Sequence, residues 1–233
     1  MVFYDTRPST CNVGYDYEET TVVFHWRARM GDKADKAQVL ILSGFLGSGK
    51  TTLLVQLIEH LRARRGDDYR IAIIENEIGA ASVDSSIIQD AGYSVTEMLS
   101  GCVCCTLIGQ LVPAIQKLRE DLNPKLIILE ATGVATPDTM AKNISIYGDC
   151  DVRIATLVDA SRWERIKMAL SMLLEAQIEP ADVICINKTD LVDEGQVSVV
   201  EQDVRKLNAT APILRSGMGL PLSDEDLDML AGD

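Results

Sequence analysis

The sequence has little positive charge, few histidines and no long hydrophobic run, and these shortages exclude several classes of function. Among its 233 residues, 22 Lys and Arg stand against 35 Asp and Glu, so the net charge is −13. A chain this acidic lacks the basic face that nucleic-acid phosphates require, and we expect no nucleic-acid partner. Glu, Asp, Asn or Gly interrupts every apolar run before it reaches transmembrane length, so we also expect no membrane partner.

The N-terminal residues show no clear hydrophobic periodicity. They lack the apolar core of a signal peptide, and together with the absence of a membrane span this predicts a cytoplasmic protein. We interpret residues 1–37 as a poorly defined extension, in which residues 20–26 could form one strand. The sequence from Met30 onward reads like an ordinary N-terminus, so we assign no function to residues 1–29.

From residue 38 onward, short apolar runs alternate with segments of helical periodicity. The apolar runs predict strands at residues 39–43, 70–75, 93–97, 125–130, 152–158, 182–187 and 212–215. The periodic segments predict helices at about residues 50–65, 83–90, 106–121, 161–176 and 196–207, a loop and a helix within 131–146, and a terminal helical turn at 223–230. This alternation predicts an α/β fold, with a mostly parallel sheet and helices on both faces, in one domain over residues 38–233.

The first predicted strand leads directly into the complete P-loop pattern, Gly44-x-x-x-x-Gly49-Lys50-Thr51, and then into a helix. Glycines let backbone N–H groups turn toward phosphate oxygens, and the helix N-terminus adds its positive dipole end. We predict that Lys50 reaches the β- and γ-phosphates and that the Thr51 hydroxyl ligates Mg²⁺. The nucleotide-binding residues predicted from this motif are Gly44, Gly47, Ser48, Gly49, Lys50, Thr51 and Thr52. The fold is therefore predicted to be a P-loop NTPase.

A second motif, Asn187-Lys188-Thr189-Asp190, follows an apolar run and matches the N-K-x-D pattern of GTP-binding proteins. The Asp190 carboxylate can accept hydrogen bonds from guanine N1–H and N2–H₂, a donor pair that adenine lacks. We therefore predict GTP as the nucleotide. Asn187 can either bond the base or tether the P-loop, and the Lys188 stem can lie over the ring. Ser216 begins a loop after the last predicted strand that can complete the base pocket.

A third motif, Glu130-Ala131-Thr132-Gly133, ends a strand that is almost entirely apolar. Glu130 fits a carboxylate held near Mg²⁺, directly or through water. Gly133 fits a backbone N–H that senses the γ-phosphate, so that the following loop can switch between nucleotide states. The alternative is a strand-end glutamate that faces solvent. The catalytic candidates are thus Lys50, Thr51, Glu130 and Gly133, and none of them is assigned as the group that orients the attacking water.

Three cysteines crowd into the loop Gly101-Cys102-Val103-Cys104-Cys105. Thiolates are good ligands for Zn²⁺ and other soft or borderline metals, and three on one short loop can converge on a single ion. They leave the fourth position open, which suits a metal that must be handed over. A buried cysteine cluster and a redox sensor are the alternatives. We expect Cys150 and Cys185 to act as packing residues, because Cys185 lies inside an apolar run.

Several other polar residues are weaker candidates. Glu75 ends the second predicted strand and Glu77 follows it. Both carboxylates could contact a metal or the water around Mg²⁺, and the alternative is that they lie in a solvated turn. Asp84 is a candidate for a first switch residue. The two histidines, His25 and His60, are poor ligand candidates, and we expect His60 to be exposed among the charged residues of its helix.

Together these motifs resemble the CobW/HypB/UreG class of P-loop GTPases, and within it the CobW-type metallochaperones. The resemblance rests on Gly44-Phe45-Leu46-Gly47-Ser48-Gly49-Lys50-Thr51-Thr52, Glu75-Asn76-Glu77-Ile78-Gly79, Gly101-Cys102-Val103-Cys104-Cys105, Glu130-Ala131-Thr132-Gly133 and Asn187-Lys188-Thr189-Asp190. It implies GTP hydrolysis with Mg²⁺, coupled to binding and delivery of a transition metal, most often Zn²⁺. Carried over by position, it implies Cys102, Cys104 and Cys105 as metal ligands and Glu75 as an additional one. It is also compatible with a homodimer.

The sequence departs from this family's pattern at several points. Ala80 stands where relatives usually have a glutamate, Ile78 replaces an aromatic residue, and Glu130-Ala131-Thr132-Gly133 replaces the frequent Glu-Thr-Ser-Gly. The usual C-terminal domain, often with a His-rich stretch, is not found in the sequence. We therefore expect a minimal GTPase domain that serves one client enzyme.

The main functional hypothesis is a GTP-dependent metallochaperone that delivers a metal to a client metalloenzyme or assists cofactor insertion. We expect slow turnover, as in GTPases that lack a partner's arginine. One alternative is a GTP-switched docking protein that gates a cofactor-dependent enzyme, with structural cysteines. Another is a GTPase that is controlled by thiol oxidation.

Overall fold

The computed structural model describes residues 36–66, 69–75, 94–97 and 106–232, together with two short strands near the N-terminus. The chain divides into two compact units, Met1–Asp35 and Lys36–Asp233. In the first unit the described residues are β1 (Val13–Gly14) and β2 (Val23–Phe24), which pair antiparallel. The second of these strands falls inside the segment 20–26 in which a strand was expected.

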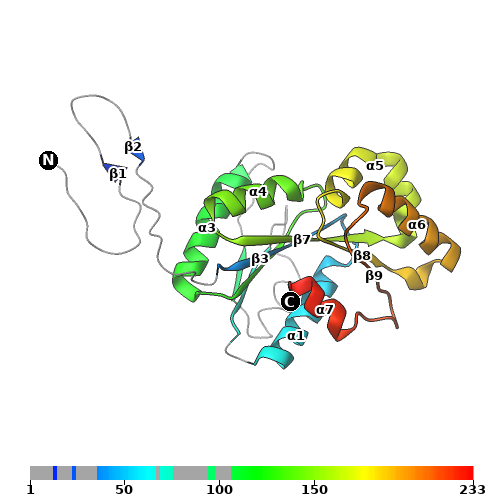
Figure 1. The fold of residues 1–233 in the computed structure, drawn as a ribbon, viewed down its shortest axis with the longest axis horizontal. Helices are drawn as coiled ribbons and strands as arrows, with labels where there is room; N and C mark the ends of the chain where they lie inside the picture. The colour runs from blue at the N-terminus through cyan, green and yellow to red at the C-terminus, as the bar shows by residue number, and fades with distance from the viewer. Residues whose placement is uncertain are drawn as a thin grey trace. The chain divides into compact units, whose positions relative to one another are not determined.

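Seven described strands of the second unit form one sheet. They are β3 (Gln38–Gly44), β4 (Ile71–Glu75), β5 (Ser94–Glu97), β6 (Leu126–Glu130), β7 (Asp151–Asp159), β8 (Val183–Asn187) and β9 (Ile213–Arg215). Their order across the sheet is β5-β4-β6-β3-β7-β8-β9, and every neighbouring pair is parallel (Figure 1). The predicted α/β fold with a parallel sheet is confirmed, and each predicted strand appears within two residues of its expected limits.

Helices connect these strands and cover both faces of the sheet. The described helices of this unit are α1 (Lys50–Arg65), α3 (Thr106–Leu122), α4 (Pro137–Tyr147), α5 (Trp163–Ile178), α6 (Glu194–Leu207) and α7 (Asp224–Ala231). Two 3₁₀ turns, η1 (Ala160–Arg162) and η2 (Thr189–Leu191), follow β7 and β8. The helix expected at 83–90 lies outside the described residues. In the part of the chain that the structure describes, no helix has both the length and the apolarity to span a bilayer.

The alternating side chains of β3 divide the core into two layers. Val39 and Ile41 pack in a cluster with apolar residues of α3, α4, α5 and α6. Leu40 and Leu42 face the other way and pack with residues of α1 and α7. Figure 1 shows the same division, with α1 and α7 on one face of the sheet and the other four helices on the opposite face. A strand buried on both faces needs a continuous apolar run, which is what β3 has.

The strand register places the predicted motifs along one edge of the sheet. Glu75 and Glu130 are partners across β4 and β6, and Asp159 and Asn187 are partners across β7 and β8. Between these pairs, the carboxyl end of β3 leads into the P-loop at Gly44. Because all the strands are parallel, the loops that follow them meet at this edge, where ligands of open α/β sheets bind.

Candidate nucleotide-binding site

The P-loop glycines satisfy two requirements, one conformational and one spatial. Gly44, Gly47 and Gly49 have φ angles of +135°, +73° and +103°, a region that side-chain-bearing residues rarely adopt. A Cβ atom on Gly44 would overlap the carbonyl oxygen of Leu157, and one on Gly49 would overlap the Asn187 side-chain amide. The loop thus lies against β7 and β8 with backbone contacts that only glycine permits.

The polar side chains of the loop are buried around the predicted phosphate position. Lys50 begins α1, is 6% exposed and donates a hydrogen bond from Nζ to the Gly44 carbonyl at 3.1 Å. The hydroxyls of Ser43 and Ser48 are buried and have no hydrogen-bond partner among the described residues. Buried polar groups are normally paired, so the unpaired hydroxyl of Ser48, which lies in the P-loop itself, fits a site for a polar, anionic ligand.

Thr51 and Glu130 meet although 79 positions separate them in the sequence. The Thr51 hydroxyl lies 3.2 Å and 3.3 Å from the two carboxylate oxygens of Glu130 and donates to that carboxylate. A hydroxyl and a carboxylate are oxygen donors of the kind that Mg²⁺ prefers, so these two residues fit the predicted magnesium site. Glu130 is therefore directed toward the P-loop helix, whereas the alternative interpretation had it facing solvent.

The loop after β6 packs closely on the P-loop. A Cβ atom added to Gly133 would lie 2.6 Å from the Leu46 backbone nitrogen, so only glycine fits there. On its other side, this loop is held by Gln177 of α5, whose Nε2 donates to the carbonyls of Gly133 at 3.0 Å and Ala135 at 3.4 Å. The Gln177 side chain is buried, and sequence reasoning did not identify it, because nothing in a glutamine near the end of a helix points to a loop 44 residues away.

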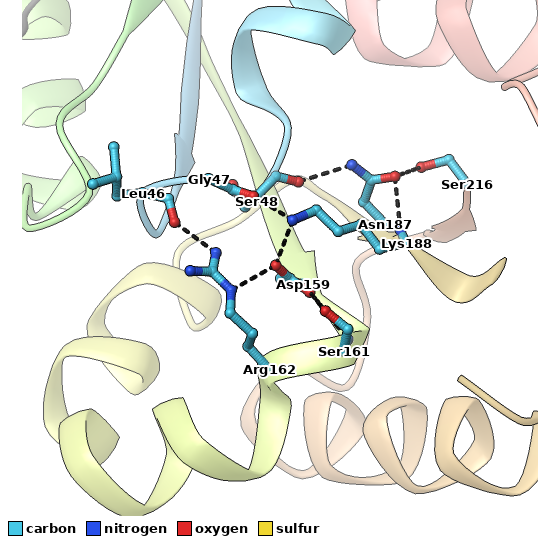
Figure 2. A network of polar contacts seen from close by, with 9 residues as sticks. All are labelled: Leu46, Gly47, Ser48, Asp159, Ser161, Arg162, Asn187, Lys188 and Ser216. Carbon is cyan, nitrogen blue, oxygen red and sulfur yellow. Dashed lines mark hydrogen bonds and ion pairs between the residues drawn. The ribbon is translucent and has the colours of Figure 1, made fainter. Parts of the chain in front are cut away.

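Asn187 tethers the P-loop in this structure. Its Nδ2 donates to the Ser48 carbonyl at 2.8 Å, and its Oδ1 accepts from the Lys188 backbone N–H and from the Ser216 hydroxyl. Of the two roles left open from the sequence, tether or base contact, the structure shows the tether (Figure 2). Ser216 therefore supports Asn187 from the loop that follows β9.

Asp190 lies beside the same loop. Its Oδ1 accepts a hydrogen bond from the Met218 backbone N–H at 2.9 Å, and a Cβ atom on Gly217 would overlap its carboxylate. The structure thus brings the predicted base-selecting carboxylate together with the loop at 216–219, as the sequence suggested. Met218 and Leu191, which flank this carboxylate, are 90% and 63% exposed.

Lys188 bonds to two groups that the motif alone did not reveal. Its Nζ donates to the Gly47 carbonyl at 2.6 Å and lies 2.8 Å from Oδ2 of Asp159. The same carboxylate oxygen accepts from Nε of Arg162 at 2.8 Å, and Arg162 Nη2 donates to the Leu46 carbonyl at 2.6 Å. Figure 2 shows this network, in which Asp159 lies between the two cations.

Asp159 is ionised in this setting. Burial opposes ionisation, but hydrogen bonds from Lys188, Ser161 and Arg162 outweigh it and hold the pKa of the carboxyl below its usual value. Sequence reasoning missed Asp159, although it ends the apolar run of β7 in the same way that Glu130 ends that of β6. The same signal, an acidic residue at the end of a buried strand, could have found it.

Other predicted residues fall into three groups. Thr52 is in the first turn of α1 and is exposed. Cys150 and Cys185 are buried, as expected of packing residues, and burial raises the pKa of the Cys185 thiol to about 11. The predicted metal ligands Cys102, Cys104 and Cys105, with Glu77 and Asp84, lie outside the described residues, and for Glu75 only the backbone is described. Within the described residues, no group of three His, Cys, Asp or Glu side chains could hold a metal ion.

The exposure predicted for His60 is wrong. Its side chain is only 8% exposed, and its Nε2 lies 2.9 Å from Oδ1 of Asp228 on α7. Its Nδ1 lies 3.2 Å from Asp224 at the start of the same helix. The charged neighbours of His60 along α1 suggested a solvated position, but α7 packs over this part of α1 and covers it.

Comparison with known proteins decides the family. The profile of the CobW/HypB/UreG nucleotide-binding domain matches residues 38–215, which extend from β3 to the end of β9. The chain belongs to the CobW/HypB/UreG family. The matched range contains the P-loop, the loop after β6 and the motif at Asn187–Asp190.

Named relatives of this CobW/HypB/UreG chain include two proteins associated with zinc. Zinc-regulated GTPase metalloprotein activator 1 of Dictyostelium discoideum is 30% identical over 224 residues, covering 78% of this chain and 46% of that protein. Zinc chaperone YjiA of Escherichia coli K12 is 31% identical over 202 residues, covering 82% of this chain and 60% of that protein. The chain therefore spans less than two thirds of the length of either relative.

Among solved structures, the hydrogenase maturation factor HypB of Archaeoglobus fulgidus has the same fold. The TM-score is 0.62 with 19% sequence identity, and the match covers 84% of this chain and 89% of HypB. At this identity the likeness supports the fold alone, and it confirms the P-loop NTPase architecture of this CobW/HypB/UreG chain.

Proposed function

We propose that the chain binds and hydrolyses GTP with Mg²⁺ and uses this cycle to load and deliver a transition metal, with Zn²⁺ as the first candidate. The observation that carries the proposal is the convergence of three motifs on one edge of the sheet: the P-loop, the Thr51–Glu130 pair and Asp190. The names of the zinc-associated relatives support the metal part. The composition favours the cytoplasm as the place of action.

In this proposal each described residue acts on one part of the nucleotide. Backbone N–H groups of the P-loop and the Lys50 ammonium would bind the phosphates, and the Asp190 carboxylate would select guanine through N1–H and N2–H₂. Thr51 and Glu130 would hold Mg²⁺, which when bound neutralises charge on the phosphate oxygens. The Gly133 loop, which packs on Leu46, is placed to respond to the γ-phosphate through its backbone N–H.

The metal would be bound by Cys102, Cys104 and Cys105, with Glu75 as a further ligand. The backbone of Glu75 ends β4 next to Glu130, so the segment that leads toward the cysteine loop begins beside the proposed magnesium site. GTP binding would order the loops after Glu75 and Glu130 and thereby change the geometry around the cysteines. Hydrolysis would reset it, and the metal would pass to a client enzyme.

The nucleotide part is tested by two substitutions with different expected outcomes. Lys50→Ala should abolish measurable GTP binding, because the phosphates lose their buried cation. Glu130→Gln should retain GDP binding while lowering the hydrolysis rate at least tenfold and weakening its dependence on Mg²⁺. Fluorescent nucleotide titration and phosphate release measure the two effects. Hydrolysis unchanged in Glu130→Gln would refute the role of that carboxylate.

The metal part is tested by replacing Cys102, Cys104 and Cys105 together with serine. Zn²⁺ affinity should fall strongly in this variant and should depend on a GTP analogue only in the wild type. Cys150→Ser is the matched control, because a serine hydroxyl can keep the bond that the Cys150 thiol donates to the Gly148 carbonyl. Equal Zn²⁺ affinity in the triple variant and the control would exclude the cysteine loop as the metal site.

A second candidate function is nucleotide-switched docking to a cofactor-dependent enzyme. The observation that favours it is the set of exposed apolar side chains around the site, namely Leu46, Val134, Leu191 and Met218. A partner that covers these residues would bury apolar surface next to the bound nucleotide. This candidate predicts nucleotide-dependent partner binding that survives metal chelation, whereas delivery of a metal predicts that chelation abolishes the transfer.

A further inference from the structure

Three consecutive carbonyl groups of the P-loop accept hydrogen bonds from side chains that follow β7 and β8. The pairs are Arg162 Nη2 with Leu46 at 2.6 Å, Lys188 Nζ with Gly47 at 2.6 Å, and Asn187 Nδ2 with Ser48 at 2.8 Å (Figure 2). A carbonyl that is bound by such a donor is kept from turning toward the phosphates, which an anion-binding loop must face with N–H groups.

Two of these three donors are fixed by one carboxylate. Oδ2 of Asp159 accepts from Arg162 Nε and Lys188 Nζ, each at 2.8 Å, while Oδ1 accepts from the Ser161 backbone N–H and hydroxyl. The Asp159 side chain has no exposed surface, so these bonds are shielded from the competition with water that weakens exposed ion pairs. The carboxylate therefore fixes the position of both cations relative to the loop.

The Arg162 side chain also lies close to the backbone of the loop. A Cβ atom on Gly47 would be 3.3 Å from Nη2 and 3.7 Å from Nη1 of Arg162, so the guanidinium is in contact range of the loop backbone. Asp159 carries one negative charge against two positive charges on Arg162 and Lys188, and one positive charge is left over beside the loop. That surplus favours binding of a polyanion such as a nucleoside triphosphate.

We propose that Arg162 is a positioning residue for the P-loop. Anchored on Asp159, it keeps the Leu46 carbonyl from turning toward the phosphates and adds the surplus charge, and both effects prepare the loop for the phosphate chain of the nucleotide. This role rests on the proposed GTP binding and extends it to a residue outside the P-loop and the Asn187–Asp190 motif. Because Arg162 acts on the phosphate side of the site, it affects affinity without affecting the choice of base.

The test compares Arg162→Gln with Arg165→Gln in the full chain. Arg165 is an exposed residue of the same helical segment, so the two variants lose the same charge and differ in whether the lost group contacts the P-loop. The probes are fluorescent GDP and a non-hydrolysable GTP analogue with Mg²⁺, titrated at several salt concentrations. Affinity for inosine diphosphate, which lacks the exocyclic amino group of guanine, reports base selection separately.

Arg162→Gln should lower the affinity for both guanine nucleotides about tenfold. It should also reduce the salt dependence of binding, since a charged hydrogen bond and a net charge are lost. The ratio of GDP to inosine diphosphate affinity should stay as in the wild type, and Arg165→Gln should stay within about twofold. Arg162→Lys, which keeps the charge, should recover part of the loss. Melting temperatures without nucleotide show whether a variant is folded.

The outcomes separate this inference from the proposed function. Wild-type binding of GDP, with equal affinities in Arg162→Gln and Arg165→Gln, would overturn the role of Arg162 and leave the proposed function standing. A changed ratio of GDP to inosine diphosphate affinity in Arg162→Gln would overturn the assignment to the phosphate side. Failure of the wild type to bind any guanine nucleotide would overturn the proposed function and this role with it.

Discussion

The two halves of the binding edge hold their loops in different ways. On the side of β7 and β8, ionised and amide side chains bind three adjacent P-loop carbonyls, and a buried carboxylate anchors two of the donors. On the side of β6, a neutral amide of Gln177 donates to the Gly133 loop, and the Thr51 hydroxyl donates to the Glu130 carboxylate.

This difference matches what each half would have to do in the proposed cycle. Charge-assisted hydrogen bonds are stronger than neutral ones, so the side at β7 and β8 is organised before a nucleotide arrives. The Gly133 loop on the side of β6 is held by a neutral side-chain amide, which suits a loop that changes position with the γ-phosphate. Fixed recognition of the nucleotide and variable response to it would then reside in different halves of one edge.

The largest expected effect comes from removing the charge that anchors the first half. Asp159→Asn leaves Lys188 and Arg162 without their shared carboxylate, and we expect about 2 kcal/mol lower unfolding free energy, because the carboxylate is buried but both cations are partly exposed. Urea denaturation at neutral pH measures this loss. Ser161→Ala, which removes only the hydroxyl that donates to Asp159, should cost less than half as much. An equal loss in both variants would contradict the anchoring role.

Base selection is the next largest effect. Asp190→Asn keeps the side-chain oxygen that accepts from the Met218 N–H, but places an N–H donor where the second carboxylate oxygen was. Preference should then move from guanine toward xanthine nucleotides by roughly 100-fold, because a carbonyl replaces the guanine amino group in xanthine. Competition titrations with GDP and xanthosine diphosphate measure the ratio. An unchanged ratio would exclude Asp190 as the base selector.

A smaller effect is expected from the second half of the edge. Gln177→Leu fills nearly the same volume but loses the bonds to the Gly133 and Ala135 carbonyls, which should lower stability by about 1 to 2 kcal/mol. The preference for a GTP analogue over GDP should also change, because the Gly133 loop loses its support. Gln116→Leu, in which an exposed bond to the Tyr147 carbonyl is lost, is the control. Equal nucleotide preferences in the two variants would contradict a switching role for the loop.

The smallest expected effect is a loss of fold stability at low pH. The folded pKa of Asp159 lies below its ordinary value of 3.8, so its ionised form stabilises the fold above about that pH. This stabilisation is lost as the pH falls through the folded pKa. The difference in melting temperature between the wild type and Asp159→Asn should therefore be constant from pH 7 to 5 and shrink below about pH 4. A difference that shrinks already near neutrality would point to another group.

Those parts of the molecule that depend on residues close together in the sequence could be predicted from it. The apolar runs placed the strands, and the P-loop and the Asn187–Asp190 motif fell at strand ends as predicted. Contacts between distant segments were harder to predict. Arg162 reaches Leu46 across 116 positions, and nothing in its sequence context distinguishes it from the many arginines of protein surfaces.

The positions of two further residues could not be predicted in the same way, for different reasons. His60 has charged neighbours along its helix, and its burial results from the packing of α7, which the local sequence does not indicate. Asp159 was different, because it carries the same signal as Glu130, an acidic residue at the end of an apolar strand. Glu130 carries this signal within the motif Glu130–Gly133, whereas Asp159 carries it without an accompanying motif.

Among the described glycines, Gly219 differs from Gly44 and Gly49 in its tolerance of substitution. Gly219 has a φ angle of +82°, but an added Cβ atom would meet nothing within 4 Å. Asn, which visits the left-handed backbone region more readily than most residues, should be accepted at this position. Gly44 and Gly49 have no such freedom, since their neighbours Leu157 and Asn187 occupy the space. In a saturation-mutagenesis screen for nucleotide binding, Gly219 would exchange with Asn while Gly44 and Gly49 would admit no other residue.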